Sequence, residues 1–401
     1  MQKKNVTTLA AALLLAAVAA PSAQAFDVGG SNGWKFSTDG FLNVFATYQT
    51  VEERPVDVID GKLGSNGQQE FRIRTGLLPV GIGLNIKSPT TNGVDYAIRL
   101  GIYPQIQNNG GSRTDLSPNI DFREINMTAD GKFGQVLAGR AINLYQAKNI
   151  LTDMTLFGAG VIGPVNSGPT MGHIGYGYLY PNFGAQIRYT TPSLSGLKVA
   201  FSVNDTNDIG SATVRNVPRL ETEISYATAL NGVKLQAWVS GLYQRASFSD
   251  ASAIDGHATS VGGAGGVQVG MGGLDLLASC YGGQALGMLG IQGGDALSAD
   301  GEERDNWGFL TQATYKLTPV LKLGVNYGQS RAELAGNDGS FVNDDGESIN
   351  IQKQQAAVVA LTYNVNDFVQ LIGEYTWAQD RWYNGATQDA NIGAVGTFIY
   401  W

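Results

Sequence analysis

The chain has 401 residues, including 54 glycines and 12 prolines, and its formal net charge is −8 because 34 acidic residues outnumber 26 basic ones. This acidic balance argues against a nucleic-acid-binding protein, since such proteins present basic surfaces to phosphate. The single cysteine, Cys280, excludes an internal disulfide and a cysteine-based zinc or haem site, and we interpret it as a small apolar side chain.

The N-terminus has the pattern of a secretory signal peptide. Residues 1–4 are basic, residues 9–20 form an unbroken apolar run, and residues 23–25 read Ala-Gln-Ala, a cleavage pattern. The run is too short to span a bilayer as a helix, so we expect residues 1–25 to be removed. Residues 26–401 then form one domain. Loss of Lys3 and Lys4 leaves 24 basic against 34 acidic residues, a net charge of −10.

Apolar and polar residues alternate along many segments, which is the period of a β-strand between two different environments. The pattern runs through residues 198–204, 233–244, 321–328 and 369–377. No segment after the signal peptide reaches about 18 consecutive apolar residues, which argues against a transmembrane helix. A soluble β-sandwich also alternates. The polar faces rich in Lys and Gln, and the apolar faces ending in Tyr or Trp, favour a membrane barrel.

The connections between these segments alternate between short and long. Seven short turns are predicted at residues 88–93, 129–134, 191–196, 229–232, 270–273, 318–319 and 364–367. Eight longer connections are predicted at residues 52–68, 105–118, 141–172, 205–218, 249–258, 286–305, 332–353 and 381–389. Fifteen connections join sixteen strands. The sequence therefore predicts an all-β fold, a 16-stranded antiparallel transmembrane β-barrel with short turns on one side and long loops outside.

Residues 123–140 read Arg-Glu-Ile-Asn-Met-Thr-Ala-Asp-Gly-Lys-Phe-Gly-Gln-Val-Leu-Ala-Gly-Arg, a strand, a glycine-rich turn and a second strand. This segment resembles the strand–turn–strand that precedes the third loop in Gram-negative trimeric general porins. Residues 180–183, Tyr-Pro-Asn-Phe, and residues 189–197 are also similar to that family. The resemblance is most specific between residues 120 and 205.

The resemblance implies a homotrimeric, water-filled channel in the outer membrane of a Gram-negative bacterium. It also implies that the third external loop, here residues 141–172, folds into the lumen and narrows it. Family members often carry several acidic residues on this loop. This loop offers only Asp153, with Lys148 beside it, and it lacks the Pro-Glu-Phe-Gly-Gly segment. Residues 156–160, Leu-Phe-Gly-Ala-Gly, look like its loose counterpart.

The last residues, 395–401, read Val-Gly-Thr-Phe-Ile-Tyr-Trp and resemble the C-terminal assembly signal of outer-membrane barrels. That signal usually ends in Phe, so Trp401 keeps its aromatic character. The resemblance implies recognition by the barrel-assembly machinery through the Trp401 segment and a setting in outer-membrane lipid and lipopolysaccharide. We expect the terminal aromatic residues to lie in the interfacial girdle.

Selection in a wide pore depends on its diameter and on rings of lining charge. Arg72 and Arg74 flank Ile73 in the chain, so alternation places the two arginines on one face of the strand. It also turns Arg99 and Arg188 inward. We expect these arginines to converge on a wall opposite Asp153, although they could simply pair with neighbouring acids. With the positions that match the family segment, the candidate constriction residues are Arg72, Arg74, Arg99, Arg123, Arg140, Arg188, Asp153 and Lys148.

The preferred sign of the permeating ion stays open at this stage. The total charge favours cations by focusing field into the lumen. The acids expected to line the external vestibule tilt the prediction towards cations; they are Asp295, Asp300, Glu302, Glu303, Asp338, Asp344, Asp345 and Glu347. Alternation also turns Glu221, Glu223 and Glu374 inward. The arginine cluster, in contrast, favours anions locally.

The sequence thus predicts a porin for passive diffusion of small hydrophilic solutes and ions, with no cofactor and no metal. The alternative is a substrate-specific porin for a sugar or for an anion such as phosphate; Trp238 on an inward face hints at the first and the arginines at the second. An enzyme is disfavoured because the two histidines, His173 and His257, lie in no nucleophile motif. A soluble secreted β-protein would leave the apolar strand faces unexplained.

Overall fold

A computed structural model describes residues 26–64, 67, 69–108, 120–163, 168–249, 252, 254–338 and 349–401. The predicted signal peptide, residues 1–25, lies outside these ranges, as do three of the predicted vestibule acids, Asp344, Asp345 and Glu347. Within the described ranges, no helix is long and apolar enough to cross a membrane.

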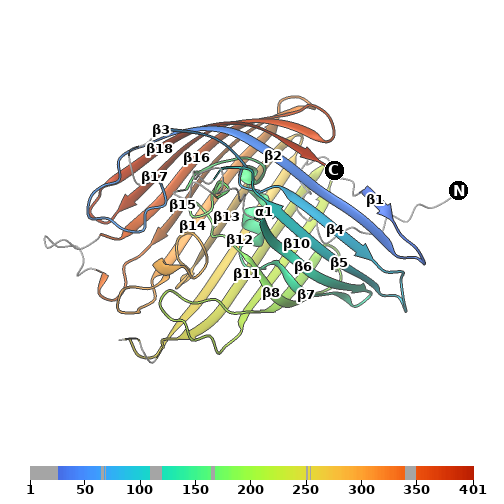
Figure 1. The fold of residues 1–401 in the computed structure, drawn as a ribbon, viewed down its shortest axis with the longest axis horizontal. Coiled ribbons are helices and arrows are strands. Elements are labelled where there is room, and N and C mark those ends of the chain that lie inside the picture. The colour runs from blue at the N-terminus through green and yellow to red at the C-terminus, as the bar shows by residue number, and fades with distance from the viewer. Residues whose placement is uncertain are drawn as a thin grey trace.

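The chain folds into one closed antiparallel sheet (Figure 1). Its strands are β1 (Phe26–Gly29), β2 (Lys35–Val51), β3 (Gln69–Arg74), β4 (Gly81–Lys87), β5 (Asp95–Pro104), β6 (Ile120–Gly131), β7 (Gly134–Ile142), β8 (Phe183–Thr190), β9 (Leu197–Asn204), β10 (Arg219–Leu230), β11 (Val233–Ser247), β12 (His257–Met271), β13 (Leu274–Gln284), β14 (Asp305–Lys316), β15 (Leu321–Ala332), β16 (Ile351–Asn364), β17 (Val369–Trp382) and β18 (Thr387–Tyr400).

These eighteen strands make up sixteen wall strands of the barrel. β3 and β4 both pair with β2 and are two halves of one wall strand. The short β1 pairs antiparallel with the first residues of β2 and is not counted as a wall strand. β18 pairs with β2 from Ala390 to Tyr400, which closes the ring. The predicted 16-stranded antiparallel barrel is confirmed.

The turns follow the predicted rhythm. All seven predicted short turns join neighbouring strands; between β10 and β11, for example, Asn231 and Gly232 have φ values of 51° and 82°, as a tight hairpin requires. One predicted long connection is wrong. β17 and β18 continue outward to Trp382 and Thr387, so only four residues separate them. The third loop spans residues 143–182, longer than predicted, and contains α1 (Ala147–Thr152) and the 3₁₀ helix η2 (Met154–Phe157).

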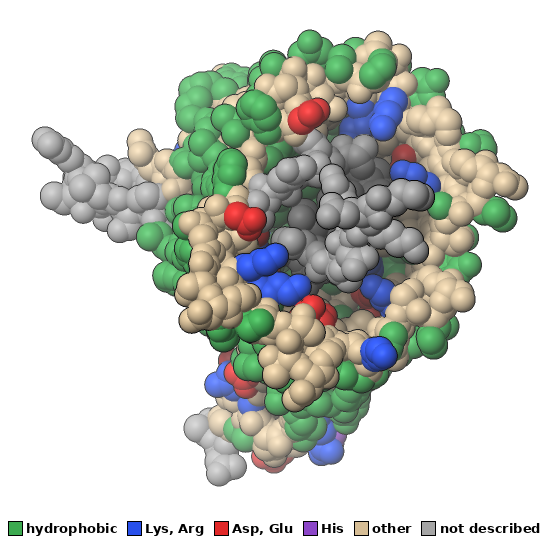
Figure 2. All heavy atoms as spheres, turned by 90° about the vertical axis from the view of Figure 1, so that its right-hand side faces the viewer, with side chains coloured by type: hydrophobic (Ala, Val, Ile, Leu, Met, Phe, Trp, Pro, Cys, Tyr) green, Lys and Arg blue, Asp and Glu red, His purple; other side chains and the backbone are tan. Residues whose placement is uncertain are grey.

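The two faces of the wall differ as the alternation predicts. Val239 and Ile187 are more than half exposed on the outer face, while their neighbours Trp238 and Gln186 are buried on the inner one. Cys280 is exposed on the outer face of β13, beside buried Ser279 and Tyr281. Seen from the right-hand side of Figure 1, hydrophobic side chains lie along much of the outer margin, and Lys, Arg, Asp and Glu side chains lie closer to the centre (Figure 2).

The C-terminal aromatic residues divide between the two faces. Phe398 pairs with inward-facing Asn43 and Tyr400 with Phe41, so both rings are buried inside the wall. Phe398 lies 5.6 Å from the Phe157 ring and 6.1 Å from Phe45. The expectation that these two aromatics belong to the outer girdle is therefore wrong. Trp401 lies opposite Gly40, where an added Cβ would come 2.3 Å from its ring.

The wall is interrupted between β3 and β4. Over residues 75–80 the ladder to β2 stops, and the Asn43 side chain replaces it by accepting the Gly76 N–H at 2.8 Å and donating to the Leu78 carbonyl at 2.9 Å. The third loop supplies a further partner, since Leu77 donates its N–H to the Gly158 carbonyl at 2.9 Å. Buried backbone groups need such partners. The break therefore places loop residues in contact with the wall.

Candidate functional site in the barrel lumen

Inward-facing carboxylates hold the backbone of the third loop. On β17, Glu374 accepts hydrogen bonds from the N–H groups of Ala159 and Gly160 at 2.8 and 3.0 Å. On β10, Glu221 does the same for Leu144 and Tyr145, at 2.7 and 3.1 Å. Bonds from backbone N–H groups to an ionised carboxylate are stronger than neutral ones. The two wall acids therefore fix both ends of the segment that carries α1 and η2.

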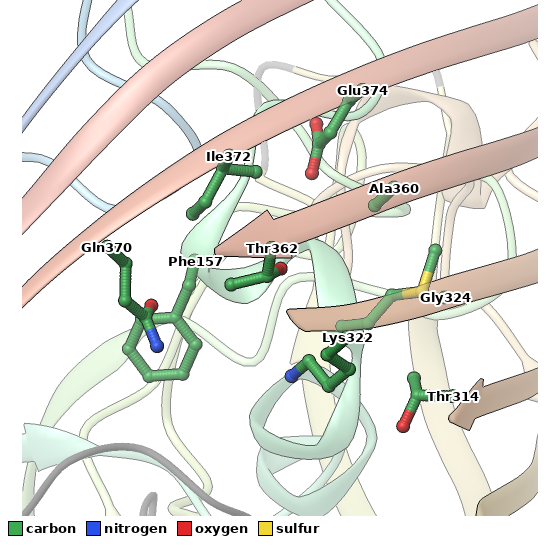
Figure 3. A pocket seen from close by; sticks show the side chains of 10 residues that line it. Phe157, Thr314, Lys322, Gly324, Ala360, Thr362, Gln370, Ile372 and Glu374 are labelled. Carbon is green, nitrogen blue, oxygen red and sulfur yellow. The ribbon is translucent and has the colours of Figure 1, made fainter. Parts of the chain in front are cut away.

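A small recess lies between η2 and the inner faces of β14 to β17 (Figure 3). Met154 and Phe157 of η2 form its loop side, and Lys322 is its single basic residue. Its wall residues are Thr314, Lys322, Gly324, Ala360, Thr362, Gln370, Ile372 and Glu374. Lys322 makes no ion pair with any described residue.

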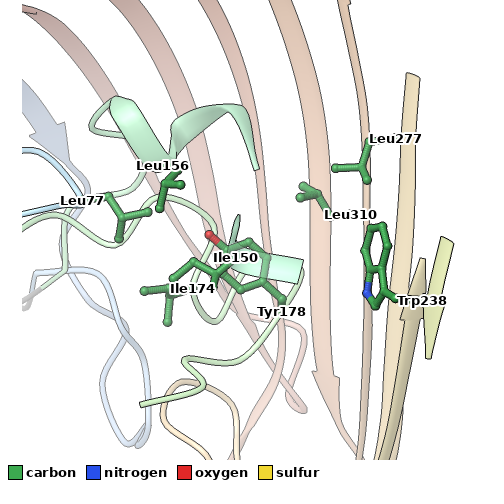
Figure 4. Close-up of a cluster of buried hydrophobic side chains, with 8 residues drawn as sticks. All are labelled: Leu77, Ile150, Leu156, Ile174, Tyr178, Trp238, Leu277 and Leu310. Atoms are coloured by element: carbon green, nitrogen blue, oxygen red, sulfur yellow. The ribbon is translucent and has the colours of Figure 1, made fainter. Parts of the chain in front are cut away.

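Apolar side chains complete the attachment of the third loop (Figure 4). Ile150 of α1 and Leu156 of η2 belong to a buried cluster with Trp238 of β11 and Leu310 of β14. The Trp238 indole also donates to the Asn149 side chain at 3.0 Å. The ring predicted as a hint of a sugar-binding surface is thus used in holding α1.

Asp153 lies between α1 and η2 and is buried. Its carboxylate accepts from the Thr155 N–H at 2.9 Å, from the Tyr178 hydroxyl at 2.7 Å and from Asn326 of β15 at 3.2 Å. His173 approaches it at 3.8 Å, and burial lowers the pKa of this imidazole below its ordinary value. The Asp153 carboxylate is therefore engaged by β15 and by its own loop.

Arg72 and Arg74 share the inner face of β3, as predicted, while Ile73 is half exposed outside. Arg72 lies 3.5 Å from Glu70 and donates to the Asn108 carbonyl. Arg74 is fully buried and donates through Nη2 to the Gly168 carbonyl of the third loop. Its Nε and Nη1 have no hydrogen-bond partner among the described residues.

Arg99 and Arg123 are the paired members of the set. Arg99 lies between two carboxylates, 2.9 Å from Asp39 and 2.8 Å from Glu124. Arg123 pairs with Asp121 at 2.7 Å and stacks on the rings of Tyr103 and Phe183. For these two, pairing with nearby acids describes what the structure shows.

Arg188, Lys148 and Arg140 are placed differently from one another. Arg188 is on the inner face of β8 and donates to the Ile142 carbonyl at 3.5 Å. Lys148 of α1 is buried, and it interacts electrostatically with Glu223, as Arg188 does. Arg140 pairs across the sheet with Ile125 and Ala185, both exposed, and so lies on the outer face. The register therefore separates Arg140 from the other candidates.

Sequence reasoning missed two inward cations and a set of contacts between external loops. Arg219 pairs with Glu221, and the spacing of two in one strand could have indicated this; the same alternation could have indicated Lys322. In the loops, Lys62 lies 3.4 Å from Asp295, and Arg304 binds Asp338 through two bonds of 2.6 and 2.7 Å. Burial and the charge of Asp295 raise the pKa of Asp60 beside them. Two predicted vestibule acids are thus neutralised.

Comparison with solved structures places the fold among outer-membrane porins. The outer membrane channel DcaP of Acinetobacter baumannii matches with a TM-score of 0.68 and 16% identity, over 94% of this chain and 99% of that one. The anion-selective porin from Comamonas acidovorans matches with a TM-score of 0.62 and 14% identity, over 92% and 100% of the chains. The trimer form of OmpT from Vibrio cholerae matches with a TM-score of 0.54 and 12% identity, over 92% and 100%.

No curated protein matches the chain in sequence. The model of the Gram-negative porin family, in contrast, matches residues 9–396, which is nearly the whole chain. The closed 16-stranded barrel agrees with that match. The chain belongs to the Gram-negative porin family.

Proposed function

We propose that the third loop lies across the lumen and that its narrow passage favours small anions over cations. The passage is bounded on one side by residues 143–182 and on the other by the arginine wall, defined here as Arg72, Arg74, Arg99, Arg123 and Arg188. The observation that carries the proposal is the uneven pairing of charge: lumenal carboxylates are engaged by protein donors, while several lumenal cations are not.

The engaged carboxylates contribute little attraction to a passing cation. Glu221 and Glu374 each bind two loop N–H groups, and Asp380 of β17 binds the N–H groups of Lys62 and Leu63 at 2.6 and 3.1 Å. Asp153 is enclosed by hydroxyl and amide donors. Buried and hydrogen-bonded charges of this kind are compensated locally.

Among the candidate constriction residues on the inner side, Arg74, Arg188 and Lys148 have no acidic partner within 4 Å in the described part of the chain. Arg74 also has two N–H-bearing atoms without a partner there. Lining charges set the sign of selectivity in a wide pore. Glu223 offsets part of the charge of Arg188 and Lys148, so Arg74 is the least compensated of the three, and its positive charge favours anions in spite of the negative total. The description of the Comamonas acidovorans structure as anion-selective supports this sign by analogy.

The assembly that we propose is a homotrimer exported by the signal peptide of residues 1–25 and inserted through the C-terminal Trp401 segment. The trimer form of Vibrio cholerae OmpT supports the trimer by analogy of fold. Contacts with lipopolysaccharide and with the barrel-assembly machinery belong to the same proposal. In planar bilayers, such a trimer should insert in events of three equal conductance steps, and single steps only would contradict it.

Reversal potentials in a potassium chloride gradient test the selectivity. The double substitution Arg72→Gln and Arg74→Gln should shift the reversal potential towards that of potassium. The expected change in the chloride-to-potassium permeability ratio is about fivefold, corresponding to roughly 1 kcal/mol of attraction between unit charges 4 Å apart in water. Arg215→Gln, in an exposed pair with Asp208, is the matched control. An unchanged ratio in the double variant would remove both residues from the passage.

A further inference from the structure

We propose that three basic side chains on the outer face of the barrel form a binding site for the phosphate groups of lipopolysaccharide. They are Arg331, Lys353 and Arg381, which we call the basic row. The inference rests on the proposed function in one respect, the contact with lipopolysaccharide, and it gives that contact a place on the wall and a chemistry.

The basic row crosses three neighbouring strands in register. Arg331 of β15 lies opposite Lys353 of β16, which lies opposite Arg381 of β17. The three strands lie side by side in the wall (Figure 1). Opposite residues of an antiparallel pair have Cβ atoms about 4.5–5.5 Å apart. Ser330 and Asp380, next to the row in the chain, are fully buried on the lumenal side, so alternation turns the row outward.

The chain compensates the positive charge of the basic row only in part. Arg331 lies 2.8 Å from Glu333, whereas Lys353 and Arg381 have no acid within 4 Å in the part of the chain that the structure describes. Both arginines act electrostatically on Lys353 as like charges. Like charges on opposite residues destabilise a sheet. A bound anion relieves this repulsion, and a phosphate group offers several acceptor oxygens to guanidinium and ammonium groups.

The next outward residues on these strands are three glutamines, Gln329, Gln355 and Gln379, again opposite one another. Gln355 accepts from the Tyr327 hydroxyl and donates to Gln379, both at 2.8 Å, and Gln379 donates to Asp389 at 3.1 Å. This hydrogen-bonded chain uses the amides of Gln355 and Gln379 and the one acid beside them. The basic row is therefore the charged group that is open to a ligand.

The outward residues further along the same strands place the basic row at the membrane surface. Tyr327 and Trp377 form the next level, and Val325, Val359 and Tyr375, each about half exposed, form the one after. An apolar band edged by aromatic residues is the lipid-facing surface of a membrane barrel, and its long loops are external. The basic row lies above the band, at the end with the long loops, and so at the level of the external headgroups.

Binding of lipid A, the phosphorylated lipid end of lipopolysaccharide, to the purified full-length channel in nonionic detergent tests the site. The double substitution Lys353→Gln and Arg381→Gln should weaken binding about 25-fold, or about fivefold for each basic residue beside anionic headgroups. Dephosphorylated lipid A should bind the parent and the variant equally weakly. Equal affinity of the two proteins for lipid A itself would overturn the site.

A matched control removes two other arginines from the outer face. Arg140 of β7 and Arg245 of β11 are exposed near the long-loop ends of their strands, and the residues opposite them are uncharged. Arg140→Gln with Arg245→Gln removes the same charge and should leave the affinity for lipid A unchanged. An equal loss of affinity in both double variants would mean that lipid A responds only to total charge, which contradicts a site.

Heat unfolding gives a second measurement, because a ligand that binds the folded protein raises its unfolding temperature. Lipid A should raise that temperature more in the parent than in the Lys353→Gln, Arg381→Gln variant. Without lipid A the variant should unfold no earlier than the parent, since its like-charge repulsion is removed. An equal rise in both proteins would contradict the site. Lys353→Gln alone serves if the double variant does not fold.

Two other occupants are separated by the same binding assay. Phosphatidylglycerol that binds as tightly as lipid A would assign the basic row to phospholipid headgroups, and displacement of lipid A by inorganic phosphate would assign it to free phosphate. Either result would overturn lipopolysaccharide as the ligand. The reversal potential of the double variant should equal that of the parent, because the row faces away from the lumen. A parent channel that prefers cations would overturn the proposed function and leave the site standing.

Discussion

Glu374, Glu221 and Asp380 face the lumen, yet each of these carboxylates accepts hydrogen bonds from two consecutive backbone N–H groups of a loop. The side chain that would offer negative charge to an ion is instead part of a loop attachment. At the scale of residues, the number of inward acids is therefore a poor measure of the field that a solute meets, because compensated charges act mainly on their own partners.

Replacing Glu374 should loosen the third loop. Glu374→Ala leaves the N–H groups of Ala159 and Gly160 without their acceptor, at a cost of about 1.5–3 kcal/mol for each bond to a charged group. We expect larger current fluctuations in single channels and a lower unfolding temperature. Glu374→Gln keeps one acceptor oxygen, so its current fluctuations and unfolding temperature should lie between those of the parent and of Glu374→Ala. Equal current noise in Glu374→Ala and the parent would mean that the loop is held elsewhere.

His173 should make stability depend on pH. Its Nδ1 lies 3.4 Å from the Asn326 amide nitrogen and 3.8 Å from Asp153, and its Nε2 lies 3.4 Å from the Ala356 carbonyl. Burial lowers the pKa of this imidazole, so the folded protein holds it neutral. Below an unfolded pKa of about 6.5 the unfolded chain binds the additional proton, and stability then falls until the lowered folded pKa is reached.

Urea unfolding in lipid vesicles at several pH values measures this effect. The parent should lose up to about 1.4 kcal/mol of unfolding free energy per pH unit below pH ~6.5 through this group. His173→Asn should reduce that slope, whereas His257→Asn, at an exposed position, should not. Parallel curves for all three proteins would exclude His173 as the source.

The sequence predicts on which side of the sheet a side chain lies, but not which residues it contacts. Alternation correctly turned Arg72, Arg99 and Glu374 inward, because a strand has a side-chain period of two. The partner of each side chain depends on loops that return from distant parts of the chain. Glu374 meets residue 159 across more than 200 positions, and no local pattern indicates that contact.

At the scale of elements, the divided strand β3–β4 is the feature that connects wall and loop. Gly76 lies in the break, where an added Cβ would come 2.1 Å from the Gly158 carbonyl oxygen. The sequence did not predict the break, since the segment between the connections at residues 52–68 and 88–93 was counted as one strand. It arises because Asn43 and the third loop supply the hydrogen bonds that the ladder omits.

Gly76→Ala should therefore destabilise the protein. The methyl group forces the backbone of residue 158 to move, and insertion of one carbon into a packed site costs about 1–3 kcal/mol. We expect a lower midpoint of urea unfolding and a changed conductance, since the loop moves with residue 158. Gly373→Ala, where an added Cβ meets nothing within 4 Å, is the control. Equal midpoints for the two variants would show that the backbone of residue 158 moves away from the added methyl group at no measurable cost.

At the scale of the whole molecule, the chain is an outer-membrane channel for passive diffusion and not an enzyme, as its family and fold establish. The rhythm of turns predicted the sixteen strands because every short hairpin leaves a local signature of Gly, Asn or Pro. The facing of Phe398 and Tyr400 was missed because it depends on register with β2, at the opposite end of the chain.

The proposed anion preference should fade as salt is added. The Debye length falls from about 30 Å at 0.01 M to about 3 Å at 1 M, so dissolved ions screen the lumenal charges. Reversal potentials measured at a fixed concentration ratio should approach the neutral value as the mean concentration rises through this range. The variant lacking the charges of Arg72 and Arg74 should change less over the same series. A preference independent of salt would assign selectivity to pore size.

The interruption between β3 and β4 also bears on any attempt to widen the channel by engineering. Excising residues 143–182 would remove the Gly158 carbonyl that accepts the Leu77 N–H, while Asn43, Gln107 and Pro104 would still bond to other residues of the break. An amide without a partner beside hydrocarbon is costly. The segment that we propose as the narrowing element thus also supplies a hydrogen bond to the wall, so a truncated protein would need a new partner for the Leu77 N–H.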